Sequence, residues 1–185
     1  AVDAAVAVQF SLAVCYPEAG NIGGGGFMVI RNSDGLKAVI DYREKAPLDA
    51  ARDMYLDISG KIIEGLSTET HLASGVPGTV DGMIKIHSRY GKLNFREVIQ
   101  PAIDQAENGF PVTMGQAASL NRNREYFISK NAVPPAFVRD SSWKEGDILR
   151  QPELAETLKR IRDLGRDGFY SGETADLIVK EMKRG

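Results

Sequence analysis

The sequence contains few of the residues that most often carry enzyme chemistry. Its 185 residues include one cysteine, Cys15, and two histidines, His71 and His87. A single cysteine excludes an internal disulfide framework, and two histidines without paired carboxylates make a poor metal site. No apolar stretch approaches the roughly 20 residues that a bilayer-spanning helix needs. We therefore expect no disulfide, no metal and no membrane span in this chain.

The charge is mixed rather than concentrated. There are 23 lysines and arginines against 25 aspartates and glutamates, for a net charge of -2, and no basic run interrupts the pattern. Such a balance argues against a nucleic-acid-binding surface. With 43% hydrophobic residues the chain can bury one sizeable core, so we predict a single domain over residues 1–185. The chain opens without a methionine, and we expect it to be part of a longer protein.

Hydrophobic spacing predicts a helix-rich chain with one β-hairpin near its start. Segment 2–14, rich in alanine and valine, predicts a helix that is apolar nearly all round, and such a helix is usually buried. Segments 27–31 and 36–41 read as two strands joined by a turn at 32–35. Further helices are predicted from Thr79 to Gly91, from Asn94 to Gly109 with a kink or restart at Pro101, over 114–129, from Pro152 to Gly165 and over 173–183, with a loop at 131–146. This order fits an α+β or layered α/β/β/α protein that lacks some of its strands.

The most informative stretch runs from Ala19 to Arg43 and begins with the glycine run Gly23–Gly26. A phosphate-binding loop would lead into a helix and carry a lysine and a hydroxyl after its last glycine. Here the run leads into Phe27–Ile30, a predicted strand. A tight crossing, where glycines let chain segments pack closely, is the favoured interpretation.

Arg43, just after the second predicted strand, is the candidate binding residue. A guanidinium there can hold a small carboxylate with two parallel hydrogen bonds. A surface ion pair with Asp41 or Glu44, worth little in water, explains the same residue equally well from spacing alone. The residues by themselves leave both interpretations open.

No spacing of serine, threonine, cysteine and histidine indicates a catalytic triad. His71 follows Thr70 in a hydroxyl-rich loop, but no group is placed to orient a base. His87 lies on the apolar side of a predicted helix and is expected to be a satisfied core histidine. Cys15 is expected to be inert packing. We therefore assign no catalytic residue within the chain.

Five motifs, in order, resemble the γ-glutamyltranspeptidase (glutathione hydrolase) family. They are AVDAAVAV, AGNIGGGGFMVI, DYREKAP, HLASGVPGTVDG and DGFYSGETADLI, and together they cover nearly the whole chain. The resemblance implies an N-terminal-nucleophile hydrolase fold, an αββα sandwich, of which this chain is a helix-rich part of the large subunit. It also implies a precursor that cleaves itself. A threonine freed at the start of the small subunit would then be the nucleophile and, through its α-amino group, the base.

By the same resemblance, Arg43 matches the arginine that binds the α-carboxylate of the γ-glutamyl group. The implied reaction is transfer or hydrolysis of the γ-glutamyl group of glutathione and related amides through a threonine acyl-enzyme. No metal or organic cofactor is implied, and the implied partners are the substrate and the small subunit. The nucleophile lies outside these residues, so we expect this part alone to show no turnover. The implied location is the periplasm or the outside of the cell.

Two alternatives stay open at this point. A β-lactam acylase or a poly-γ-glutamate-processing relative would keep the fold and change the substrate. A non-catalytic domain would use Arg43 to bind a free amino acid.

Overall fold

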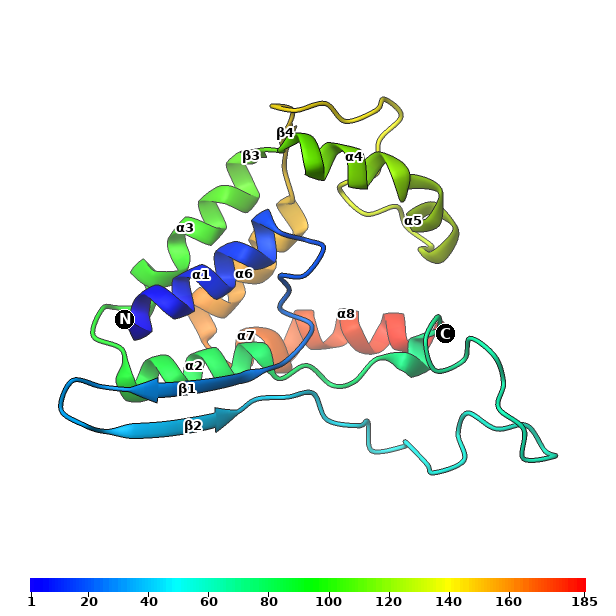
Figure 1. The fold of residues 1–185 in the computed structure, drawn as a ribbon, viewed down its shortest axis with the longest axis horizontal. Coiled ribbons are helices and arrows are strands. Elements are labelled where there is room, and N and C mark those ends of the chain that lie inside the picture. Colours follow the sequence, from blue (N-terminus) through cyan, green and yellow to red (C-terminus); the bar gives the residue numbers. More distant parts are fainter.

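The computed structural model describes all 185 residues and is mainly helical (Figure 1). A helix, α1 (Val2–Cys15), precedes the hairpin of β1 (Phe27–Arg31) and β2 (Lys37–Asp41), and a 3-10 turn, η1 (His71–Ala73), follows. The later elements are α2 (Thr79–Tyr90), α3 (Phe95–Asn108), β3 (Phe110–Pro111), α4 (Met114–Arg122), α5 (Arg124–Lys130), β4 (Ile148–Leu149), α6 (Pro152–Leu164), α7 (Asp167–Tyr170) and α8 (Gly172–Met182). The predicted hairpin is confirmed, and so are the helices predicted at 2–14, 79–91, 94–109, 152–165 and 173–183.

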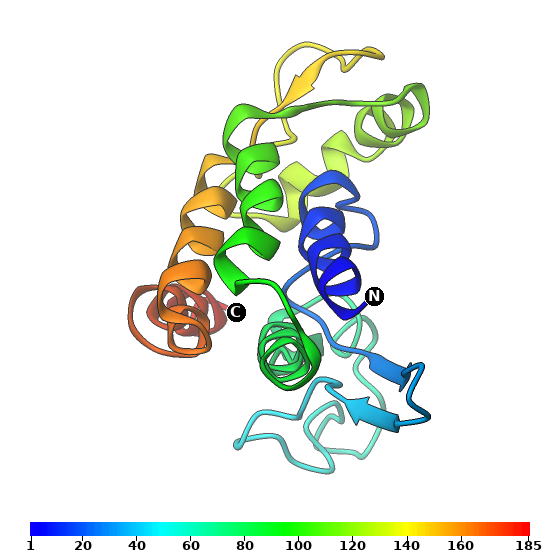
Figure 2. The same ribbon diagram turned by 90° about the vertical axis from the view of Figure 1, so that its left-hand side faces the viewer.

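The core lies among four helices and one face of the hairpin. Helices α1, α3 and α6 lie side by side, and α2 passes between them and the hairpin (Figures 1 and 2). The largest side chains that are fully buried in this core are Phe10, Met83, Ile86, Ile99, Ile103, Leu158 and Ile161. Each such side chain contributes about 1.5–3 kcal/mol through removal of apolar surface from water. None of the helices is both long enough and apolar enough to cross a bilayer.

Local sequence signals fix the ends of several helices. The Asn94 side chain accepts a hydrogen bond from the Arg96 N–H at 3.0 Å and so caps α3. Gly109 ends the same helix with a φ of 89°, a left-handed conformation that favours glycine. Pro152 occupies the first turn of α6, as predicted. Helix α4 begins with a capping box between Thr113 and Gln116.

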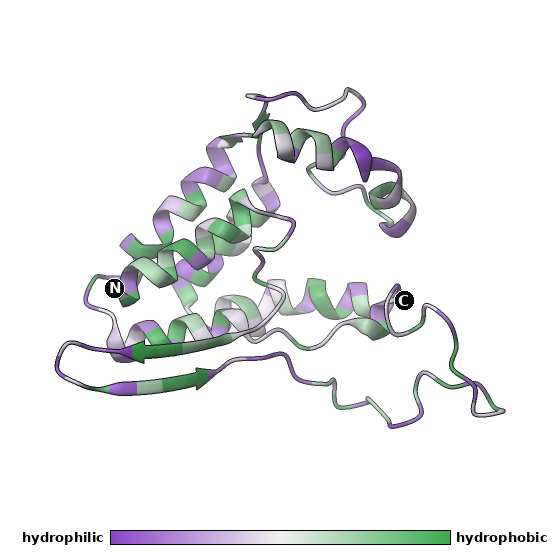
Figure 3. Ribbon diagram, viewed as in Figure 1, coloured by the Kyte–Doolittle hydropathy of each residue, from purple (hydrophilic) through white to green (hydrophobic).

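The hairpin has apolar side chains on both faces. Strands β1 and β2 pair antiparallel, with Val29 opposite Val39. Met28, Ile30, Ala38 and Ile40 pack toward the helices. Val29 and Val39 lie on the other face and are 76% and 71% exposed. Figure 3 shows this apolar character along both strands. Nothing in residues 1–185 covers that second face.

The expectation that the helix at 2–14 is buried holds for one of its sides only. Val6, Phe10 and Val14 are buried against the core, whereas Val8 is 54% exposed and Leu12 is also exposed. Helix α1 packs on α3 and α2, which cover one side of it. Its opposite side meets no other element of this chain, so the apolar residues there remain at the surface.

Two further expectations differ from the structure, and three short elements were not predicted. The single helix predicted over 114–129 is two helices, because Asn123 leaves helical geometry and its side chain bonds back to the Ser119 carbonyl at 2.9 Å. Pro101 does not restart α3, which is continuous from Phe95 to Asn108. The short β3–β4 ladder, pairing Phe110 with Leu149, and the single-turn helix α7 were not predicted. The β3–β4 ladder and α7 are too short to show a hydrophobic period.

Replacement of Phe10 tests the packing of α1. The ring is fully buried and lies edge-on to Phe95 at 6.0 Å between centroids. Phe10→Ala should lower the free energy of unfolding by about 3–5 kcal/mol, because it removes a large side chain and leaves a cavity. Urea unfolding measures this change. Val8→Ala on the exposed side of the same helix should change stability by no more than about 0.5 kcal/mol. Equal losses for both variants would contradict this packing.

Candidate functional site

Arg43 lies two residues after β2, where the sequence placed it, and its main chain is held in place. Its N–H donates to Asp41 Oδ1 at 2.9 Å. Its side chain is 64% exposed, with Nε 3.7 Å from Glu44 Oε2. The Phe27 ring lies beside it, 5.8 Å from the guanidinium carbon to the ring centroid. The main chain at Arg43 is therefore fixed while the charged group remains accessible.

The contacts of Arg43 favour ligand binding over a structural ion pair. Asp41 uses its carboxylate on the Arg43 main chain and forms no ion pair with the guanidinium. The contact with Glu44, from Nε to Oε2 at 3.7 Å, is longer than a hydrogen bond. An exposed ion pair of this kind contributes little to stability. The two terminal Nη groups form no hydrogen bond within residues 1–185, so they can donate two parallel hydrogen bonds to a carboxylate.

The glycine run is a tight crossing, as predicted. A Cβ atom added to Gly25 would lie 2.6 Å from the carbonyl oxygen of Tyr42 and 2.7 Å from the Cα of Arg43. Real Cβ atoms essentially never approach within 3.0 Å of another heavy atom, so only glycine fits here. The neighbouring carbonyl of Gly24 accepts hydrogen bonds from the N–H groups of Gly78 and Thr79 at 2.8 and 2.9 Å. The glycine run and the HLASGVPGTVDG motif therefore meet in space.

The segment that carries Arg43 is held on both of its sides. The N–H of Tyr42 donates to the Gly26 carbonyl at 2.9 Å, which extends the hairpin past its last paired residue. Lys45 exchanges two main-chain hydrogen bonds with Val76, at 3.1 and 2.8 Å. The Tyr42 side chain is partly buried against the core, and this burial raises the pKa of its phenol. Arg43 thus lies between two anchored neighbours.

A cavity of about 240 Å³ lies beside this segment, between α2 and α7. Within it, Asp81 pairs with Arg166 at 3.0 Å and with Lys85 at 2.5 Å. The Tyr170 hydroxyl donates to the Pro77 carbonyl at 2.8 Å and accepts the Asp81 N–H at 3.2 Å. Burial raises the pKa of Tyr170. These bonds connect α7 to the start of α2. They lie on the side of the Arg43 segment that faces the helices.

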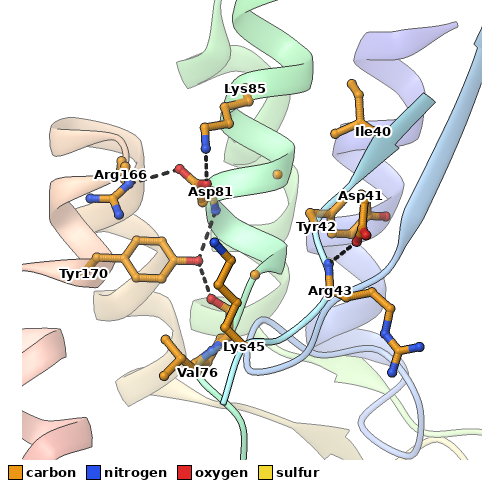
Figure 4. Close-up of a pocket in the computed structure, with 13 residues that line it drawn as sticks. Ile40, Asp41, Tyr42, Arg43, Lys45, Val76, Asp81, Lys85, Arg166 and Tyr170 are labelled. Carbon is orange, nitrogen blue, oxygen red and sulfur yellow. Dashed lines mark hydrogen bonds and ion pairs between the residues drawn. The ribbon is translucent and has the colours of Figure 1, made fainter. Parts of the chain in front are cut away.

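The guanidinium of Arg43 does not join this network. In Figure 4 it points away from Asp81 and Tyr170, although its main chain lines the same cavity. The side chains of Lys85, Arg166 and Tyr170 gather on one side of the segment, and the guanidinium lies on the other. We therefore treat the cavity as part of the support beneath Arg43 and the exposed guanidinium as the candidate binding group.

The remaining candidate residues have structural positions. His71 begins η1, and its Nε2 lies 3.2 Å from Glu181 Oε1. His87 is in the core, as predicted, but it is not satisfied: its Nε2 is 3.3 Å from Asp3 Oδ1 without hydrogen-bond geometry. Asp3 instead accepts main-chain N–H groups of the α2–α3 connection. Cys15 is half-buried, and burial raises the pKa of its thiol, which lowers its reactivity.

Sequence reasoning missed the role of Tyr42, Gly78 and Gly82. A Cβ on Gly78 would lie 2.0 Å from the Tyr42 carbonyl oxygen, and one on Gly82 would lie 2.4 Å from Tyr42 Cγ. One signal was available, because Gly82 lies inside a predicted helix, where glycine costs about 1 kcal/mol relative to alanine. Such a residue indicates close packing against another segment. No three histidine, cysteine, aspartate or glutamate side chains gather in a metal-binding arrangement.

Comparison with known proteins places these motifs in a family. The sequence model described as gamma-glutamyltranspeptidase matches residues 1–185. The chain is 48% identical over 184 residues to a glutathione hydrolase proenzyme of Pseudomonas aeruginosa, and 42% identical over 186 residues to that of Escherichia coli. Each match covers 100% of this chain and 32% of the relative, so the chain spans about a third of their length.

Solved structures agree on the fold. The γ-glutamyltranspeptidase of Helicobacter pylori superposes with a TM-score of 0.94 at 45% identity, covering 100% of this chain and 53% of that one. A cephalosporin acylase of Bacillus halodurans superposes with a TM-score of 0.83 at 22% identity, over 100% of this chain and 35% of its own, which shows a shared fold alone. The expected N-terminal-nucleophile hydrolase fold is confirmed. By its sequence over its whole length and by its structure, this chain belongs to the γ-glutamyltranspeptidase family.

Proposed function

We propose that this chain is the N-terminal part of the large subunit of an enzyme that transfers or hydrolyses γ-glutamyl groups. Its substrates would be glutathione and related γ-glutamyl amides. The proposal is supported by relatives named glutathione hydrolase proenzymes that match the full length of the chain at 42–48% identity. The similarity to the cephalosporin acylase is one of fold and gives no support to a β-lactam substrate. Nothing in the structure favours a free-standing amino-acid-binding domain.

The observation that carries the proposal is the state of Arg43. Its main chain is anchored, its guanidinium is exposed, and neither terminal nitrogen forms a hydrogen bond within residues 1–185. A γ-glutamyl donor carries an α-carboxylate at the end opposite to the amide that is cleaved. We assign Arg43 to that carboxylate, which it would bind through two parallel charge-assisted hydrogen bonds. Holding the far end of the donor would bring its γ-carbonyl to a fixed place for attack.

The nucleophile would come from the rest of the protein. A threonine at the start of the small subunit would attack the γ-carbonyl, the amine would leave, and water or an acceptor amine would take the acyl group. Thr70 and His71 do not form a substitute pair. The Thr70 hydroxyl donates to the Leu66 carbonyl at 2.7 Å, and His71 lies against Glu181. Residues 1–185 would thus supply substrate binding without supplying the reactive group.

The family resemblance also supports an expectation about location. We propose that the protein works in the periplasm or outside the cell. Cell fractionation with a cytoplasmic marker enzyme as control would test this. Recovery of the activity together with the cytoplasmic marker would contradict it.

Replacement of Arg43 by lysine tests its assignment in the full-length protein. Lysine keeps the charge and loses the planar, two-point contact. We expect the KM for a γ-glutamyl anilide to rise about tenfold to a hundredfold, which corresponds to about 1.5–3 kcal/mol. Steady-state kinetics of anilide release measure it. Arg52→Lys is the matched control, because the Arg52 side chain is 91% exposed. An unchanged KM for Arg43→Lys would contradict the assignment and would favour the interpretation of Arg43 as a surface ion-pair residue.

The proposed subunit arrangement is tested by the intact mass of the full-length protein under denaturing conditions. We expect two chains, the smaller beginning with threonine, because the nucleophile must be freed as a new N-terminus. Blocking that cleavage by changing the threonine to alanine should leave one chain without activity. A single uncleaved chain with normal turnover would contradict the proposal.

A further inference from the structure

Three glycines from two distant segments face the same short stretch of main chain. Gly25 precedes the hairpin, whereas Gly78 and Gly82 lie at the start of α2. A Cβ on any of the three would lie 2.0–2.8 Å from atoms of residues 42–44, most of them main-chain atoms. The three glycines therefore surround the main chain that carries the candidate binding residue.

Space, and not backbone conformation, requires glycine at these positions. None of the three has a positive φ, so an alanine could adopt the same backbone geometry. The obstacle is the Tyr42 carbonyl oxygen, 2.6 Å from a Cβ on Gly25 and 2.0 Å from one on Gly78. At Gly82 the obstacles are Cβ and Cγ of Tyr42, at 2.5 and 2.4 Å. A change of the Tyr42 rotamer could move Cγ, but it would leave the contacts with Cβ and with the carbonyl oxygen, because these atoms move only with the main chain.

We propose that Gly25, Gly78 and Gly82 are positioning residues that set where the Arg43 guanidinium meets the donor carboxylate. This inference rests on the role proposed for Arg43. The three glycines touch no substrate and act only by allowing residues 42–44 to lie close to α2 and the glycine run. A methyl group at any of them would move the segment outward and carry Arg43 with it.

The size of the effect follows from the distances. A Cβ on Gly25 forces a displacement of several tenths of an ångström to reach the 3.0 Å limit, and one on Gly78 forces about 1 Å. A misplacement of about 1 Å at a substrate-holding group can reduce the rate about a hundredfold. The hydrogen-bonding groups of Arg43 would be unchanged. The defect would therefore be one of position and would depend on the presence of the guanidinium.

Gly23 provides a matched control within the same run. A Cβ there would meet nothing within 4 Å, and its φ is not positive. Gly25→Ala and Gly23→Ala are thus the same chemical change, two residues apart, with opposite expected results. Gly82→Ala is the second test variant, because it approaches Tyr42 from a different element and favours the helical conformation of α2.

The experiment is a double-mutant cycle in the full-length enzyme, read as kcat/KM for a γ-glutamyl anilide. Gly25→Ala should lower kcat/KM by about tenfold or more, whereas Gly23→Ala should leave it within about twofold. In an Arg43→Ala background, Gly25→Ala should change kcat/KM by less than about twofold, because the group that it misplaces is gone. Thermal unfolding and cleavage into two chains check that each variant folds. Should Gly25→Ala fail to fold, Gly82→Ala takes its place in the cycle.

The outcomes separate this inference from the function on which it rests. If Arg43→Ala has no effect on kcat/KM, the role of Arg43 itself is wrong. If Arg43→Ala is impaired while folded Gly25→Ala and Gly82→Ala are normal, Arg43 keeps its role and the positioning inference is wrong. If Gly25→Ala lowers kcat/KM equally with and without the Arg43 guanidinium, the glycines do not act through Arg43. That result would also overturn the inference.

Discussion

The rest of the structure depends on a close main-chain contact. The segment from Tyr42 to Glu44 lies against Gly25 on one side and Gly78 on the other, closer than any residue with a Cβ would allow. The carbonyl of Gly24 accepts two N–H groups from the start of α2 and so joins the glycine run to that helix. This contact fastens the hairpin to the helical layer. It also leaves the Arg43 guanidinium on the side away from the helices.

The helices cover only one of the two apolar faces of the hairpin. Strands with apolar residues on both faces are typical of sheets that are buried on both faces. Helix α2 and its neighbours cover the face that carries Ile30 and Ile40, while Val29 and Val39 on the other face are exposed. In an αββα sandwich each sheet packs between a helical layer and a second sheet. The observed distribution fits that architecture, of which this chain contains one helical layer and two strands.

The sequence predicted the elements in which a hydrophobic pattern extends over a long segment. It did not predict the elements that depend on single contacts. Helices α3 and α6 repeat apolar residues over three turns, and the hairpin has two short apolar runs around a polar turn, so both were predictable. The break at Asn123 and the two-residue β3–β4 ladder depend on tertiary contacts that leave no period. Arg43 was found as a candidate, but its support was not, because Gly25 and Gly78 are far apart in sequence. Only the folded chain brings both of them against Tyr42.

The way Arg43 is held has an energetic consequence for binding a small anion. Ordering a backbone residue costs about 1–2 kcal/mol, and immobilising a long side chain costs up to about 2 kcal/mol more. At Arg43 the main chain is already ordered in the folded chain, by the glycine contacts and by the hydrogen bond from its N–H to Asp41, so ligand binding need not order it. A carboxylate bound by the guanidinium, as proposed, would therefore have only the side-chain torsions left to order. For a binding group on a mobile loop, ligand binding would have to order both the main chain and the side chain, and both entropy losses would weaken the affinity. A rigid main chain that carries an exposed guanidinium therefore favours tight binding in a defined orientation.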